Sequence, residues 1–91
     1  MNIEVTNPYA VNQDGTREVR VSVYNNTDSV QTAELRFDIC DEQHHQVVHL
    51  TANEQKEVSQ VHGQTGICNV TVTEQKYGDT TQRILDLDTP G

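Results

Sequence analysis

The chain has 91 residues, of which 33% are hydrophobic, and its 14 acidic and 6 basic residues give a net charge of −8. This length allows a single domain, 1–91, with a thin core and a small margin of stability. The acidic balance excludes nucleic acid as a partner, because no basic patch is available to neutralise phosphates.

The first predicted strand is 2–6. Asn7-Pro8 is expected to break it, because proline lacks the N–H that a sheet ladder uses. Residues 9–11 resume the edge and lead to Asp14-Gly15, a strong signal for a tight turn. The N-terminal region is therefore expected to form an interrupted edge strand that enters a hairpin.

The most regular pattern lies in 18–25 and 32–40, where hydrophobic and polar residues alternate on both sides of a polar turn. A two-residue period turns one face of each strand toward a core and the other toward water. Turns at 41–46, 52–55, 62–66 and 76–80 then precede four further strands, predicted at 47–51, 56–61, 67–73 and 82–88. About seven short strands without helical periodicity predict an all-β, antiparallel two-sheet sandwich, with a small barrel as the alternative.

Three segments resemble the immunoglobulin-like sandwiches of bacterial and archaeal surface proteins, including the cell-adhesion-related domain found in bacteria (CARDB). They are a strand–turn–strand unit at 21–39, a strand–turn–strand unit at 47–58 and a glycine-led strand at 66–72. Antibody-type hallmarks are missing: Phe37 takes the central place of the usual tryptophan, and no tyrosine stands two residues before Cys68. The resemblance implies an immunoglobulin-like fold and a role in binding or scaffolding without catalysis.

Cys40 and Cys68 end the third and begin the sixth predicted strand, which are antiparallel neighbours in a sandwich of this order. The two cysteines could then meet near one rim as a cross-sheet bridge. The alternation of strand faces opposes a disulfide, because Cys40 falls on the polar face of its strand while Cys68 shares a face with Val70. A bulge at 39–41 would be needed to bring the two sulfurs together. In the absence of a signal peptide, free thiols are the default. Both alternatives remain open.

Four histidines raise the question of a metal site: His44, His45, His49 and His62. Zinc sites need three or four ligands at characteristic spacings, and no Cys-x-x-Cys pattern supplies them here. The adjacent pair His44-His45, in a predicted turn, points in different directions. We therefore expect solvated loop histidines, no metal and no other cofactor.

Acidic residues gather at the same rim and on the last strand: Asp38, Asp41, Glu42, Asp86 and Asp88. None belongs to an Asp-x-Asp-x-Asp-Gly calcium loop, so a solvated face is expected. Cys40, His44 and Asp41 could supply a nucleophile, a base and an orienting group. Because they crowd one turn and no oxyanion donor is evident, an enzyme is not expected.

Two glycosylation sequons begin at Asn25 and Asn69, and without an export signal we interpret them as chance. Exposed alternate positions are rich in threonine, glutamine and arginine, which favours hydrogen-bonded protein contacts over aromatic sugar stacking. These positions are Gln31, Arg36, Gln60, Thr71, Thr73, Gln75 and Arg83.

These patterns predict a non-enzymatic structural protein. The concrete hypothesis is a small subunit that decorates or cements a larger assembly of protein subunits, such as a virus capsid or appendage. The alternative is a cell-surface module for adhesion or for carbohydrate or other ligand binding. The N-terminus has neither a basic start nor an apolar middle, and no segment reaches the roughly 20 apolar residues of a membrane span. We therefore expect synthesis in the cytoplasm, no membrane insertion and, given the acidic, lysine-poor surface, a halophilic source.

Overall fold

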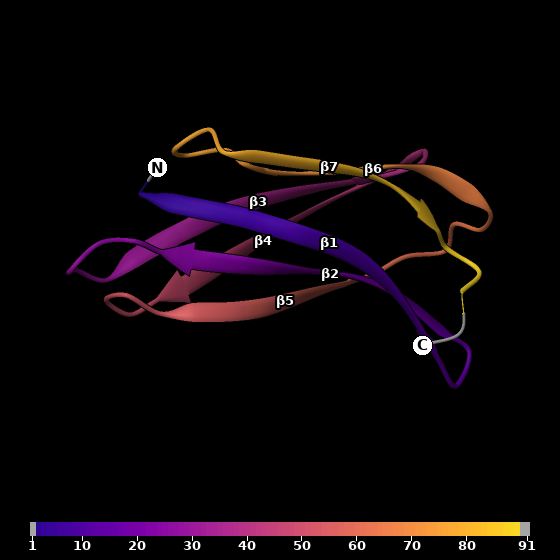
Figure 1. The fold of residues 1–91 in the computed structure, drawn as a ribbon, viewed down its shortest axis with the longest axis horizontal. Coiled ribbons are helices and arrows are strands. Elements are labelled where there is room, and N and C mark those ends of the chain that lie inside the picture. The colour runs from indigo at the N-terminus through magenta and orange to yellow at the C-terminus, as the bar shows by residue number, and fades with distance from the viewer. Residues whose placement is uncertain (1, 90–91) are drawn as a thin grey trace.

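The structure, a computed structural model, describes residues 2–89 as two antiparallel β-sheets packed face to face (Figure 1). One sheet has the order β1-β2-β5 and the other the order β4-β3-β6-β7. The strands are β1 (Ile3–Gln13), β2 (Thr16–Asn25), β3 (Gln31–Ile39), β4 (Glu42–Leu50), β5 (Gln55–Val61), β6 (Ile67–Glu74) and β7 (Thr80–Asp86). This arrangement is an immunoglobulin-like β-sandwich, which confirms the predicted fold class, and the barrel alternative is wrong.

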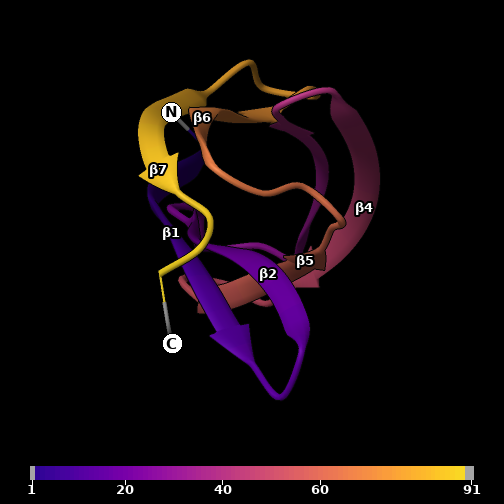
Figure 2. The same cartoon turned by 90° about the vertical axis from the view of Figure 1, so that its right-hand side faces the viewer.

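The core consists of the hydrophobic residues that alternate along the strands. Val19, Val21 and Val23 of β2 are fully buried, and they face Leu35 and Phe37 of β3 across the sandwich interior. The end-on view shows the two sheets enclosing this interior (Figure 2). The strict alternation at 18–25 and 32–39 therefore places the core, because a two-residue period gives each strand one buried face.

β1 differs from its prediction because Asn7-Pro8 does not end the strand. β1 pairs with β2 from Ile3 to Gln13, and its register shifts between Thr6 and Tyr9. Asn7 and Pro8 together lie opposite Val21, and Asn7 has a positive φ of 56°, so the one extra residue forms a bulge and the ladder continues beyond it. An edge strand tolerates proline in this way because one side of its backbone has no sheet partner.

The turn predicted at 41–46 is also wrong. Cys40 and Asp41 alone connect β3 to β4, since Ile39 pairs directly with Glu42. Cys40 has a positive φ of 52°, which allows this tight reversal. Residues 42–46 are polar and yet belong to a strand, because β4 lies at the edge of its sheet and both its faces reach solvent in part.

The last strand is shifted toward the N-terminus relative to its prediction, spanning Thr80–Asp86 instead of 82–88. Leu87 follows it and remains fully buried. The Leu87 amide donates to the carbonyl of Gly66 at 2.8 Å. The chain thus leaves the ladder after Asp86 but still packs against the end of the sandwich.

Candidate functional site

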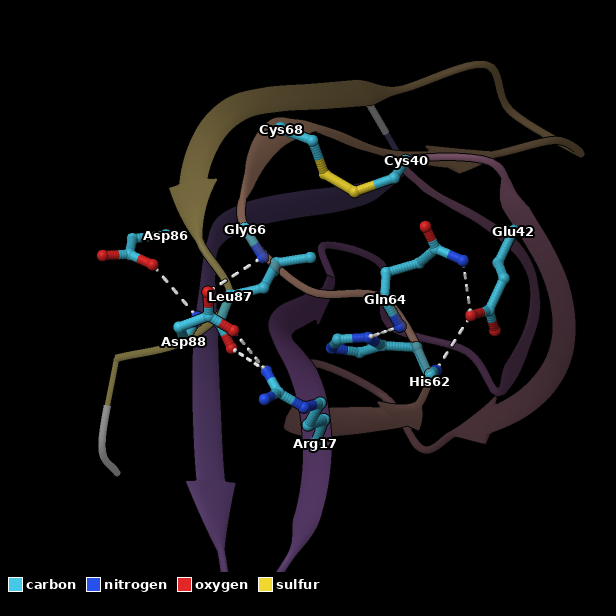
Figure 3. Close-up of a disulfide and its surroundings, with 11 residues drawn as sticks. Arg17, Cys40, Glu42, His62, Gln64, Gly66, Cys68, Asp86, Leu87 and Asp88 are labelled. Carbon is cyan, nitrogen blue, oxygen red and sulfur yellow. Dashed lines mark hydrogen bonds and ion pairs between the residues drawn. A yellow bond between two sulfur atoms is a disulfide. The ribbon is translucent and has the colours of Figure 1, made fainter.

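A disulfide closes one end of the sandwich (Figure 3). It joins Cys40 in the β3–β4 turn to Cys68 at the start of β6, with a Cα–Cα distance of 5.6 Å. Of the two alternatives left open by the sequence, the structure has the disulfide and not the free thiols, and the bridge connects neighbouring strands of one sheet instead of the two sheets. The argument from alternating strand faces failed because Cys40 lies outside β3, where its positive φ redirects the side chain away from strand alternation.

Glu42, two residues after Cys40, ties β4 to the segment that follows β5. Its Oε2 accepts hydrogen bonds from the Gly63 amide and from Gln64 Nε2, both at 2.9 Å (Figure 3). Its Oε1 lies 2.9 Å from His44 Nε2. These bonds, that of Gln64 foremost, lower the pKa of Glu42 to about 2. The carboxylate therefore fastens the 62–66 loop as long as it is ionised.

His62 occupies the interior side of this loop and is only 6% exposed. Its Nδ1 accepts a hydrogen bond from the Gln64 amide at 3.1 Å, while its buried Nε2 has no partner among the described residues. Burial lowers the pKa of His62. The carboxylate of Glu42 raises this pKa, whereas the positive charges of Arg17 and His44 lower it further. The prediction of a solvated loop histidine is wrong for His62, whose ring is buried.

Acidification is expected to destabilise the fold through His62. Its folded pKa lies below the ordinary value of 6.5, so below that pH the unfolded chain binds a proton that the folded chain does not. The free energy of unfolding should therefore decrease as the pH falls through 6.5. Denaturant titrations of His62→Asn, which keeps an acceptor near the Nδ1 position, should show a flatter dependence between pH 7.5 and pH 5.5. The exposed His45→Asn serves as control; a profile unchanged in His62→Asn would contradict this assignment.

The remaining histidines do not converge. His44 contacts Glu42, His45 is exposed, and His49 Nδ1 lies 3.0 Å from Thr32 Oγ1. His45 and His49 share a face of β4, but four residues of strand separate them by about 13 Å. Among residues 2–89 no group of three or more histidine, cysteine, aspartate or glutamate side chains is placed to hold a metal ion.

The acidic residues are likewise distributed among separate structural contacts. Asp38 pairs with Arg36 at 3.0 Å. Asp88 binds Arg17 Nη1 at 2.8 Å and accepts from the Gly66 amide at 3.0 Å, while Asp86 accepts from the Asp88 amide (Figure 3). Asp88 thus fastens the end of the described chain to β2 and to the start of β6, a structural role that its alternation with Asp86 could not reveal.

The nucleophile–base–acid grouping of Cys40, His44 and Asp41 does not assemble. The Cys40 sulfur is bonded to Cys68, so it is no free nucleophile in this state. His44 bonds Glu42 and not Asp41. No pocket is found in the part of the chain that the structure describes.

The polar positions predicted to be exposed divide into two groups. Arg36, Thr71 and Thr73 share the outer face of the four-stranded sheet, as their register shows. Gln60 instead accepts a hydrogen bond from Gln46 at 2.8 Å, and Gln31 accepts one from the Tyr77 hydroxyl. The two glutamines therefore bridge structural elements, which sequence alternation alone does not distinguish from exposure.

Strand β4 is the least protected edge of the sandwich. It spans nine residues and pairs with β3 from Glu42 to Leu50 without a register shift. It contains no proline or lysine, and Val47 on its outer side is 64% exposed. Gln46 and Lys56 connect it to β5, through Gln46 Nε2 to the Ser59 carbonyl and Lys56 Nζ to the His49 carbonyl. No sheet strand of the described residues covers its outer edge.

Comparisons with protein-family models, curated proteins and solved structures found no match for this chain. Within residues 2–89 there is also no helix that is long and apolar enough to cross a membrane.

Proposed function

We propose that the chain is a non-enzymatic interaction subunit that joins a larger protein assembly by pairing β4 with a strand of a neighbouring molecule. Its concrete form is a small decorating or cementing subunit of a shell such as a virus capsid or appendage. The observation that carries the proposal is the regular edge of β4, which pairs without a bulge and has no sheet strand beside it among the described residues, although Lys56 occupies its His49 carbonyl. An edge strand offers a row of backbone donors and acceptors to any added strand, whose side chains then determine specificity.

The other three edges carry features that oppose such pairing. β1 has Pro8 and a register shift, and the Val5 amide is occupied by Asp79 Oδ2 at 2.9 Å. β5 and β7 have only seven residues each, and they carry Lys56 and Arg83. Proline, bulges, short length and charged side chains are the usual protections of sheet edges. β4 is thus the edge that remains available for addition of a strand.

The distribution of charged residues also favours β4 as the contact strand. Glu42 is the only acidic or basic residue of β4 when its histidines are neutral, whereas the whole chain carries a net charge of −8. Two copies that meet at β4 bring one carboxylate each to the contact and keep the other acidic residues outside the paired strands. Salt weakens the remaining repulsion, because the screening length falls to about 3 Å at 1 M ionic strength.

A second copy of the chain is the first neighbour to test. We expect light scattering to give a mass above that of the monomer in about 1 M potassium chloride and a smaller mass at low salt. Val47→Lys should weaken this association at least tenfold, or about 1.4 kcal/mol. When two copies pair through β4, the lysine of each copy lies near that of the other, and the two positive charges repel. The substitution also makes the net charge of each chain less negative, which by itself would favour association.

Ile84→Lys is the matched control, because Ile84 is 70% exposed on the edge strand β7 of the same sheet. It changes the net charge by the same amount and should leave the association intact. A monomer at both salt concentrations, or equal effects of the two substitutions, would reject pairing through β4.

A cell-surface binding module is the second candidate, and the disulfide is the observation that favours it. Disulfides form and persist mainly in oxidising surroundings outside the cytoplasm. Such a module is expected to be a well-folded monomer at low and high salt, so the light-scattering experiment also distinguishes the two candidates.

A further inference from the structure

The two sequons of the chain have opposite surroundings. Asn25 is 2% exposed, and its side chain donates to the carbonyls of Ser29 and Thr51 at 2.8 Å each. Asn69 is exposed in β6, and its side chain makes no hydrogen bond with any described residue. Only a side chain that points into solvent leaves room for a bulky sugar chain. The fold therefore excludes Asn25 as an acceptor and leaves Asn69 accessible.

Asn69 also lies beside the most exposed hydrophobic residues of the sandwich. It pairs with Ile84 of β7, and Ile67 stands two positions earlier on the same face of β6. Ile67 is 72% exposed and Ile84 is 70% exposed. Polar side chains of Thr71 and Gln82 continue this face. Two neighbouring isoleucines in water are unfavourable, and a carbohydrate attached between them would cover both side chains.

We propose that Asn69 is an N-glycosylation site and that its glycan covers Ile67 and Ile84. The donor would be an oligosaccharide linked through phosphate to a polyprenol lipid. Asn69 Nδ2 attacks the anomeric carbon of the sugar and loses a proton. The bond from that carbon to the phosphate oxygen breaks, and the lipid phosphate leaves with the electron pair. No oxidation or reduction is involved, and Thr71 supplies the hydroxyl that the sequon requires.

The disulfide supports this assignment and also constrains when the transfer can occur. It indicates oxidising surroundings, the same surroundings in which exported chains receive N-linked glycans. The bond constrains the timing because it connects Cys68, the residue before Asn69, to the β3–β4 turn and so fixes the start of β6 in the folded sheet. An extended acceptor segment must leave the sheet to enter an enzyme, so transfer is expected before this bond closes. Cys68→Ser should therefore increase the fraction of chains that carry the glycan.

The test is mass spectrometry of the chain purified from the cells or particles that produce it, as intact protein and as peptides. We expect the mass of a glycan on the peptide that contains Asn69 and an unmodified Asn25. Unmodified Asn69 in all of the native protein would overturn the proposal. This measurement needs no substitution, and it does not depend on pairing through β4.

Two threonines of β6 provide matched variants for expression in the native host. Thr71→Ala removes the sequon and should abolish the modification, whereas Thr73→Ala alters the next outward position and should leave it unchanged. Thr71→Ser, which retains a hydroxyl, should restore it. Modification that persists in Thr71→Ala would show that the attachment is at another residue and reject the assignment to Asn69.

Discussion

Replacing Cys40 and Cys68 together by serine is expected to lower the free energy of unfolding by about 3–4 kcal/mol. The bridge joins residues separated by 28 positions, and a loop of this length loses much of its conformational freedom in the unfolded chain. Domains of this size have a total stability of about 5–15 kcal/mol. The loss is therefore a large share of the whole, and the double variant should unfold at a much lower denaturant concentration.

Denaturant titration of the wild-type chain with and without a strong reductant provides the direct comparison. Reduced wild type and the double serine variant should give similar midpoints, both well below that of the oxidised protein. If the reduced and oxidised chains unfold at the same denaturant concentration, the bridge contributes little and the unfolded chain is already constrained by other means.

Asn25→Ala is the substitution with the second largest expected effect, a loss of about 3 kcal/mol. Asn25 ends β2, and its amide connects this strand to Ser29 and to Thr51 beyond β4. Its Oδ1 also accepts from the amide and the hydroxyl of Thr27, at 3.0 and 2.7 Å. Alanine leaves several of these groups without a partner in a region with little access to water, where each missing bond costs about 1–3 kcal/mol.

Asn26→Ala provides the comparison at the adjacent position. Asn26 is exposed, and its side chain bonds the carboxylate of Glu4 at 2.8 Å. Exposed substitutions of this kind usually change stability by no more than about 0.5 kcal/mol. Thermal and denaturant unfolding of both variants should therefore separate them clearly. Equal losses would mean that the loop, and not the buried amide of Asn25, determines the stability of this region.

The strands of the core could be predicted because their physical signal is local. Val19, Val21 and Val23 alternate with polar residues, and β2 is buried on the corresponding face. The signal weakens at edge strands, where both faces reach solvent in part. This explains why the polar start of β4 was predicted as a turn and why Asn7-Pro8 was predicted as a break where the structure has a bulge.

The disulfide end was harder to predict because it depends on backbone conformation and on contacts between distant residues. Cys40 was assigned to a strand face, whereas its positive φ places it in a two-residue turn. His62 was expected in solvent, but Glu42 draws the following residues, Gly63 and Gln64, onto β4 and the ring becomes enclosed. The glycines of 62–66 indicate a loop, but they do not indicate which strand the loop will contact.

The disulfide also affects how the molecule would respond to a pulling force. β1 begins at one end of the long axis and β7 ends at the other (Figure 1). Tension applied through these two strands would load the rest of the chain, but the Cys40–Cys68 bond carries force directly between its ends. The segment between the two cysteines, which are 28 positions apart, therefore cannot be extended. Fully stretched, this segment would add about 100 Å of contour length. Because β4 and β5 lie between the two cysteines, they would bear no tension along the chain, whereas the strands before Cys40 and after Cys68 would be extended.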